Sequence, residues 1–426
     1  MTRVGIVGAG ITGLALSHHL AEHGVESVAF ESTDRPGGVI RTGHVDGAVL
    51  EWGPQRLRLT DPIEELVDAV GIDEAVIHAD PDLPTYVYAD GRLGEVPLSV
   101  GAFLRTDLLS ARGKLRMLAE PLTPPGRPGE TAAGLFTRKF GREAYENAIG
   151  PLFGGIYASD PGAMPARHAL DGLLRLESES GSLLRAALSR LREDRAPATS
   201  FEDGLGRLPE ALAARHADRI RFETPVESVE LADTNGDRDS QYRIRTADGT
   251  ERVDHVVLTT PADVTAEIVA DLSPASADAL ATLNYNPLAM VYLRSDADAR
   301  GLGYQVRRGE DLHTLGVTWN ASAFDRDGVH TVFLGGMDEP ELVGRPDAEL
   351  EDIAREEFEA VMDAGAEPIA VNRWERGFPA YDHTWGALDR VSLPEGVHLA
   401  TNYTARMGVP SRVREAKGLA ERLASE

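Results

Sequence analysis

The sequence predicts an α/β fold, α+β in overall content, in which a Rossmann-type nucleotide-binding domain carries an inserted mixed sheet and a helical block. Three observations predict it. The first 31 residues have the pattern strand, glycine-rich turn, helix and strand. Helical periodicity dominates from about Gly101 to Leu191, and short strands dominate from Arg219 to Gly336. A chain of 426 residues with 42% hydrophobic content can form two or three domains.

The opening unit is assigned from its apolar pattern. Arg3 to Val7 is typical of a short buried strand, and Ile11 to Glu22 has the spacing of a helix. Gly24 ends that helix, and Val25 to Phe30 is the second strand. The order strand, turn, helix, strand is the setting in which a glycine-rich turn binds a dinucleotide.

Three glycines in the first turn have the spacing of such a site. Gly8 permits the tight turn, Gly10 lets the backbone approach a pyrophosphate, and Gly13 lets the helix lie close to the sheet. Glu31 lies 21 residues after Gly10, where it can accept hydrogen bonds from a ribose. Free N–H groups and the dipole at the helix start favour the phosphates. The candidate phosphate-binding positions are Gly8, Gly10, Ile11, Thr12 and Gly13.

The remaining elements follow in chain order. The predicted helices are Ile63 to Val70, Ala348 to Met362 and Ser411 to Leu423. The predicted strands are Thr85 to Ala89, Arg92 to Val96, Arg219 to Phe222, Val226 to Leu231, Tyr242 to Thr246, His255 to Thr259, Asn284 to Leu293, Gln305 to Val306, Leu312 to Trp319, His330 to Gly336, Ile369 to Trp374 and Val397 to Thr401. Pro121 to Pro128 and Thr234 to Ser240 are predicted loops.

A cationic, glycine-rich loop follows Glu31 and bears on which dinucleotide is bound, because NAD and FAD proteins share the opening motif. Arg35 and Arg41 place positive charge near a phosphate or ribose. Gly37 and Gly38 let the backbone come close to a ligand.

Several stretches together resemble one enzyme family. VGAGITGLALSHHLAEHGVESVAFESTDRPGGVIRT, followed by LEWGPQ at Leu50 to Gln55, is similar to the FAD-binding start of the flavin amine oxidase superfamily. Within it, the chain most resembles the oxygen-dependent protoporphyrinogen and coproporphyrinogen oxidases. The same order of motifs continues through GREAYENAIGPLFGGIYASD, SFEDGLGRLPEAL, Thr224-Pro225-Val226, Arg373-Trp374 and Gly408-Val409-Pro410.

The resemblance implies FAD as cofactor and removal of a hydride from a porphyrinogen, with O2 as acceptor. The chemistry would belong to the flavin, and the sequence offers no nucleophile, triad or metal cluster; the catalytic residues stay unassigned. The positions that fall on flavin contacts, beyond the turn, are Glu31, Arg35, Gly37, Gly38, Arg41, Gly53, Pro54, Val226, Trp374, Gly408 and Val409. The expected parts are an FAD-binding domain of residues 1–56, 199–283 and 392–426, a substrate domain of 57–98 and 284–391, and a helical domain of 99–198.

The substrate positions depart from the resemblance. Relatives that bind a porphyrinogen propionate often have an arginine where this chain has Thr85. Arg56 or Arg58 could substitute, although both are typical of surface arginines, and Gln55 is a further candidate. Thr401-Asn402 and Trp385-Gly386 also differ from the family pattern.

Other activities remain open at this level. Amine oxidases of the superfamily place a lysine near the flavin on a strand, whereas Lys114, Lys139 and Lys417 all fall in predicted helices. Carotenoid-type desaturases share the opening motif, and a flavoprotein without catalytic activity is an alternative of another class.

Charge and composition narrow the setting. The formal net charge is −26, from 69 acidic and 43 basic residues, and only three of the basic residues are lysines. Such a surface suits multimolar salt, which screens self-repulsion, so we expect a halophilic source. The same field disfavours nucleic acid as a partner, and a small molecule is expected instead.

The chain has no cysteine, which excludes disulfides and thiolate zinc sites. No secretory leader and no apolar run of about 18 residues is present, so a cytoplasmic protein without a membrane span is expected. His18 and His19, adjacent on a helix, are expected at the surface, because neighbours should not face one ligand. No metal site is expected, and the oligomeric state is unassigned.

Overall fold

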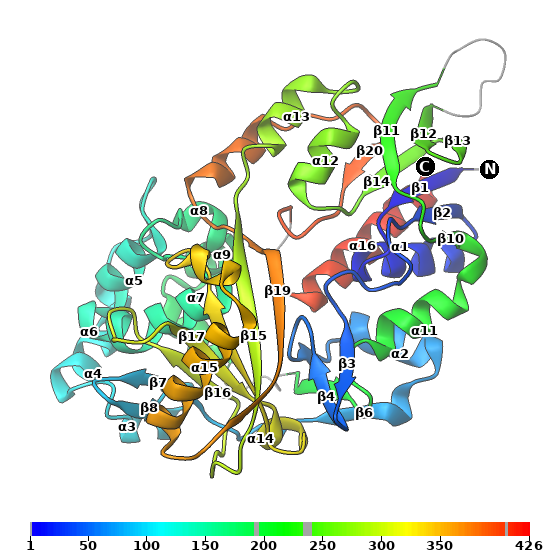
Figure 1. The fold of residues 1–426 in the computed structure, drawn as a ribbon. Coiled ribbons are helices and arrows are strands. Elements are labelled where there is room, and N and C mark those ends of the chain that lie inside the picture. The colour runs from blue at the N-terminus through cyan, green and yellow to red at the C-terminus, as the bar shows by residue number, and fades with distance from the viewer. Residues whose placement is uncertain (1, 191–195, 233–240, 405–407) are drawn as a thin grey trace.

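A computed structural model describes residues 2–190, 196–232, 241–404 and 408–426, so the predicted loop from Thr234 to Ser240 lies outside the described residues. Figure 1 shows a sheet-and-helix region that contains both termini, beside a second sheet that is flanked by a block of short helices. The predicted α/β class is confirmed.

A five-stranded parallel sheet carries the nucleotide-binding turn. Its strands lie in the order β10 (Ile220–Arg221), β2 (Glu26–Phe30), β1 (Arg3–Val7), β14 (His255–Leu258) and β20 (Val397–Leu399). Each neighbouring pair is parallel. Since β1 lies in the centre, its glycine turn is placed between the carboxyl ends of β2 and β14, which is where open α/β sheets bind ligands.

Four helices share one apolar core with this sheet: α1 (Ile11–Glu22), α2 (Asp61–Val70), α11 (Arg207–Arg215) and α16 (Val409–Ser425). Every residue from Ile11 to Leu20 is buried, as expected for a helix enclosed on all sides. The prediction that His18 and His19 lie at the surface is therefore wrong, because they are only 2% and 3% exposed.

A three-stranded antiparallel meander packs against the five-stranded sheet. It consists of β11 (Val226–Leu231), β12 (Tyr242–Thr246) and β13 (Gly249–Val253). A Cβ at Gly5 of β1 would lie 2.2 Å from Ile244 Cδ1, so the meander approaches the strand backbone directly. Helices α12 (Ala262–Ile268) and α13 (Pro274–Leu280), which the sequence did not predict, follow β14.

The second large sheet has seven strands, in the order β19 (Glu367–Pro379), β15 (Tyr285–Arg294), β18 (Val329–Gly335), β17 (Thr314–Trp319), β16 (Gly303–Val306), β7 (Thr85–Ala89) and β8 (Arg92–Glu95). All pairs are antiparallel except β16 with β7, so the predicted mixed sheet is confirmed. α14 (Asn320–Phe324) follows β17, and α15 (Asp347–Met362) shares the core of the sheet.

The helical block consists of α3 (Val100–Arg105), α4 (Ala111–Leu118), α5 (Ala132–Phe140), α6 (Arg142–Ala144), a π-helical turn (Tyr145–Ile149), α7 (Gly150–Tyr157), α8 (Ala166–Ala169), α9 (Asp171–Ser180) and α10 (Leu183–Arg190). Smaller strands complete the fold: a hairpin of β3 (Thr42–Val45) and β4 (Ala48–Glu51), and a sheet of β5 (Leu57–Arg58), β9 (Ala198–Phe201) and β6 (Val76–His78). Over the described ranges, no helix has both the length and the apolar character to cross a membrane.

Candidate FAD-binding site

The three glycines of the first turn are needed for three different reasons. Gly8 has φ +101°, and a Cβ there would lie 2.7 Å from Thr259 Oγ1. At Gly13 a Cβ would lie 2.0 Å from the Gly8 carbonyl oxygen, so any side chain would push α1 away from the turn. At Gly10 a Cβ would meet no atom of the described residues within 4 Å. Gly10 is thus not required for packing, and the space beside it fits a pyrophosphate at the start of α1.

Glu31 is held next to this turn at the end of β2. Its Oε2 accepts a hydrogen bond from the Ala9 N–H at 2.8 Å, and its Oε1 accepts from the Thr33 N–H at 3.0 Å and the Thr33 hydroxyl at 2.8 Å. The Glu31 carbonyl also accepts from the Thr224 N–H at 2.8 Å. The bond from Thr224 positions the start of β11 near Glu31, because Val226 follows Thr224 by two residues.

The cationic loop lies against the glycine turn. Gly10 and Gly37 form an isolated parallel bridge, and the Gly37 N–H donates to the Ala9 carbonyl at 2.9 Å. Arg35 is half-buried and donates to the Gly38 carbonyl at 3.1 Å. Burial, and then the nearby Arg41, lower the pKa of the Arg35 guanidinium, which remains a cation at neutral pH.

Gly53 and Pro54 reach the same loop from the other side. A Cβ at Gly53 would lie 1.9 Å from the Val39 carbonyl oxygen, so only glycine fits there. The preceding residue, Trp52, has a carbonyl that accepts hydrogen bonds from the Trp374 indole and, at 2.8 Å, from Asn372. Trp374 on β19 therefore connects the seven-stranded sheet to the glycine loop.

Gly408 and Val409 begin the last helix. Gly408 has φ +116° and is the residue before α16, which packs beside α1 in the core. Among the described residues, the nearest atom to a Cβ at Gly408 would be Pro410 Cδ at 4.0 Å, so no described atom fills the space at this helix start. Helix α1 follows Gly10 and helix α16 follows Gly408, and the two helices share one apolar core.

Sequence reasoning missed Glu51, which fastens this region together. Its carboxyl group is buried and accepts from the Leu205 N–H and the Thr42 hydroxyl, each at 2.8 Å. Burial raises the pKa of Glu51 to about 7. A charged residue directly after the apolar strand Ala-Val-Leu, within LEWGPQ, was the signal that could have identified it.

The three candidate substrate residues have different surroundings. The Gln55 amide is buried and already bonded within the protein: its oxygen accepts from Asn320 and Thr331, each at 2.8 Å, and its nitrogen donates to two main-chain carbonyls. Thr85 is half-buried at the start of β7, in the seven-stranded sheet rather than the glycine turn. Arg56 is half-buried rather than at the open surface, whereas Arg58 is exposed.

The assembled residues fit FAD. A glycine cradle at a helix start, an anchored carboxylate for the ribose and a half-buried arginine beside the phosphate position provide what the adenosine diphosphate portion needs. These three features come from residues 8–13, 31 and 35.

Comparisons with known proteins show the family to which the chain belongs. The family model of flavin containing amine oxidoreductases matches residues 11–423. The chain is 28% identical to the chloroplastic protoporphyrinogen oxidase of Oryza sativa subsp. japonica, over 94% of this chain and 84% of that protein. It is 27% identical to the coproporphyrinogen III oxidase of Staphylococcus aureus, over 98% and 95%.

Solved structures show the same fold. A protein from Exiguobacterium sp. 255-15, provisionally named a protoporphyrinogen oxidase, has a TM-score of 0.81 at 25% identity, with coverage of 100% of this chain and 99% of that one. A putrescine oxidase bound to putrescine has a TM-score of 0.74 at 18% identity, again over 100% and 99%. With the family match across nearly the whole chain, and with a site that fits FAD, the chain belongs to the flavin containing amine oxidoreductase family and is an FAD-dependent oxidoreductase.

Proposed function

We propose that the protein oxidises a porphyrinogen, a reduced tetrapyrrole with methylene bridges, and that O2 accepts the electrons. One observation carries the proposal. The relatives that are 26–28% identical over 94–98% of this chain are named protoporphyrinogen or coproporphyrinogen oxidases. The amine oxidase structures share the fold at only 18% identity.

The positions of the lysines support the same choice. Lys114 on α4 donates to the Leu104 carbonyl, and Lys417 on α16 pairs with Glu65. Lys139 on α5 is buried and pairs with Glu120 at 3.2 Å. The chain has only these three lysines, so the seven-stranded sheet contains none. An amine oxidase that uses a strand lysine beside the flavin would lack that residue here.

In this proposal the chain binds and orients, and the cofactor carries the redox chemistry. FAD, when bound, would supply the redox chemistry, which is acceptance of a hydride from a methylene carbon of the substrate and return of the two electrons, with two protons, to O2 as peroxide. The glycine cradle and Glu31 would hold the adenosine end of FAD. The Trp374 indole donates to the Trp52 carbonyl, and Gly53 packs against Val39, so this stretch positions the cationic loop.

Arg56 is the residue that we assign to a carboxylate of the substrate. Its guanidinium has no hydrogen-bond or ion-pair partner in the described part of the chain. Burial, and then the charge of Arg58, lower its pKa to about 10, so it stays cationic at neutral pH. A half-buried cation without a partner is costly, and a propionate would supply the missing bidentate acceptor two residues after Pro54.

Three further assignments accompany this function. We propose that residues 1–56, 199–283 and 392–426 bind FAD, that 57–98 and 284–391 contact the substrate, and that 99–198 form a helical domain. We also propose a cytoplasmic protein adapted to high salt, which the net charge of −26 supports.

Turnover tests the proposal. The purified flavoprotein, in high-salt buffer under air, is given protoporphyrinogen, coproporphyrinogen or putrescine, with non-enzymatic oxidation subtracted. We expect porphyrin fluorescence to appear with at least one porphyrinogen and O2 to be consumed with it. Peroxide release with putrescine alone would identify an amine oxidase, and no turnover with any of the three would favour a desaturase-like substrate or a flavoprotein without catalytic activity.

A further inference from the structure

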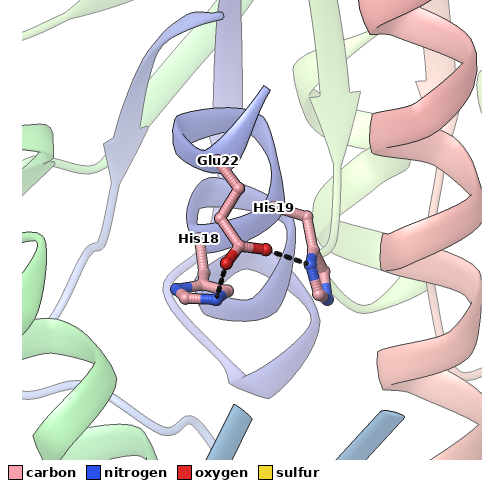
Figure 2. A group of neighbouring side chains, drawn as sticks. All are labelled: His18, His19 and Glu22. Atoms are coloured by element: carbon pink, nitrogen blue, oxygen red, sulfur yellow. Dashed lines mark hydrogen bonds and ion pairs between the residues drawn. The ribbon is translucent and has the colours of Figure 1, made fainter. Parts of the chain in front are cut away.

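Two buried histidines and one carboxylate converge at the C-terminal end of α1. His18 Nε2 lies 3.5 Å from Glu22 Oε1, and His19 Nδ1 lies 3.3 Å from Glu22 Oε2. The three ligand atoms lie within 4.8 Å of one another. Figure 2 shows the Glu22 carboxylate between the two imidazole rings.

Helix geometry explains why neighbouring residues can face one point. Each residue advances about 100° around an α-helix, so Glu22 is about 40° from His18 and about 60° from His19, on the arc between them. The side chains at i, i+3 and i, i+4 thus meet on one side of α1. The expectation that adjacent histidines cannot share a ligand overlooked this third residue, which lies between them.

The surroundings determine which nitrogen atoms face the carboxylate. His18 Nδ1 lies 3.0 Å from Nε2 of His216, the residue that follows α11. In the tautomer in which His18 Nδ1 donates to His216, the Nε2 lone pair is directed at Glu22. His19 Nε2 is buried without a hydrogen-bond partner, so Nδ1 is the ring atom available at the cluster.

We propose that His18 Nε2, His19 Nδ1 and a Glu22 carboxylate oxygen bind a divalent transition-metal ion of the zinc type, with water as the fourth ligand. Two imidazoles and a carboxylate are a common zinc donor set, with bonds of about 2.0–2.2 Å. His216 would be the outer partner that orients His18, as such partners do for metal-bound imidazoles.

The charge of Glu22 favours a cation at this position and opposes the nearby positive charges of Arg215 and Lys417. Both imidazole rings are buried, with His18 2% and His19 3% exposed, so an ion between them would be shielded from bulk water on that side. The cluster also lies at the C-terminal end of α1, where the helix dipole favours positive charge. Glu22 is 57% exposed, which gives an ion a path from solvent.

Such an ion would join elements of the FAD-binding region without touching the flavin. His18, His19 and Glu22 belong to α1, and His216 extends the contact to the end of α11. The role that follows is to hold the C-terminal half of α1 in place, which makes the site independent of the proposed substrate.

Cobalt binding tests the site on the tag-free, FAD-loaded protein after dialysis against a chelator. We expect one equivalent of Co2+ to give a visible ligand-field absorption, one equivalent of Zn2+ to abolish it, and Zn2+ to raise the melting temperature. Glu22→Gln changes an exposed side chain, so it should fold normally yet bind at least tenfold more weakly. Glu26→Gln, an exposed carboxylate paired with Arg3, is the matched control and should bind as the unaltered protein does.

Second variants separate ligation from folding. His216→Phe should weaken metal binding by about 10–100-fold, the usual effect of losing an outer partner. His255→Gln, which alters the other histidine pair, His255 and His398, should leave binding unchanged. The proposal is overturned if Co2+ gives no ligand-field band, if Glu22→Gln binds as tightly as Glu26→Gln, or if the band is lost with His255→Gln instead. Porphyrinogen turnover is not the readout, so failure here leaves the proposed function intact.

Discussion

At Gly10 no described atom occupies the space that a side chain would fill, whereas Gly8 and Gly13 are closely packed. Gly10 is therefore the glycine of this turn that we expect to contact the ligand. Gly10→Val should therefore fold normally but purify without flavin, because the branched side chain would fill the pyrophosphate position. Gly344→Val is the matched control, since Gly344 is exposed and equally free of neighbours within 4 Å. Flavin absorbance per protein measures the result, and a fully loaded Gly10→Val protein would show that the phosphates bind elsewhere.

Loss of the Arg56 guanidinium should weaken substrate binding. Arg56→Gln should raise the KM for a porphyrinogen by about 10–100-fold with little change in kcat, the size expected from losing a hydrogen bond to a charged group. Arg58→Gln is the control, because Arg58 is exposed and donates to the Ala196 carbonyl at 2.8 Å. Equal increases in KM from both variants would show that Arg56 acts only through its positive charge and does not bind a substrate carboxylate.

Strand β18 contributes a buried histidine that should make stability depend on pH. Burial lowers the pKa of His330 to about 4, from about 6.5 in an unfolded chain. Between these values the unfolded state binds more protons, so the free energy of unfolding is fully retained above about pH 6.5 and falls as the pH drops toward 4. One such group accounts for about 2 kcal/mol at pH 5.

His330→Phe should flatten this pH dependence, because the phenyl ring cannot be protonated and can pack against Phe358, whose ring centre lies 5.0 Å away. Urea unfolding at pH 7 and pH 5 measures the difference. His44→Gln, at an exposed histidine of β3, is the control and should keep the loss of stability seen in the unaltered protein. If His330→Phe lost as much stability between pH 7 and pH 5 as the unaltered protein, other groups would cause the pH dependence.

Elements with a strong local pattern were predicted well. Helix α1 and strands β11 and β12 have the predicted bounds, because their apolar spacing and flanking turns act locally. Helices α12 and α13 were missed, since seven residues are too few to establish a period. The hairpin of β3 and β4 was missed although its Asp46-Gly47 turn, in which both residues have positive φ, is a local hairpin signal.

The candidate flavin residues show what local sequence spacing can predict and what it cannot. The glycines and Glu31 could be selected because the strand, turn, helix and strand lie within one short stretch. The burial of His18 and His19 could not, because it comes from α2, α11 and α16 packing around α1. Local spacing predicts which residues share a face, and tertiary packing decides whether that face meets solvent.

For the whole molecule, the net charge of −26 predicts a requirement for salt. Acidic groups repel one another in dilute buffer, and the Debye length falls from about 10 Å at 0.1 M to about 3 Å at 1 M. The melting temperature should therefore rise as KCl increases from 0.1 M to molar concentrations. An uncharged osmolyte at equal osmolality separates screening from preferential hydration, and a melting temperature that is constant or falls with KCl would contradict halophilic adaptation.

Electron transfer from a porphyrinogen to the flavin can be followed directly in the anaerobic absorbance of the flavin. Protoporphyrinogen, coproporphyrinogen and putrescine are each added to the flavoprotein in high-salt buffer without O2. We predict that the oxidised flavin bands bleach with at least one porphyrinogen, at a rate no slower than turnover under air. The bands should stay unchanged with putrescine. Bands that persist with both porphyrinogens, or that bleach only with putrescine, would mean that the protein does not oxidise porphyrinogens.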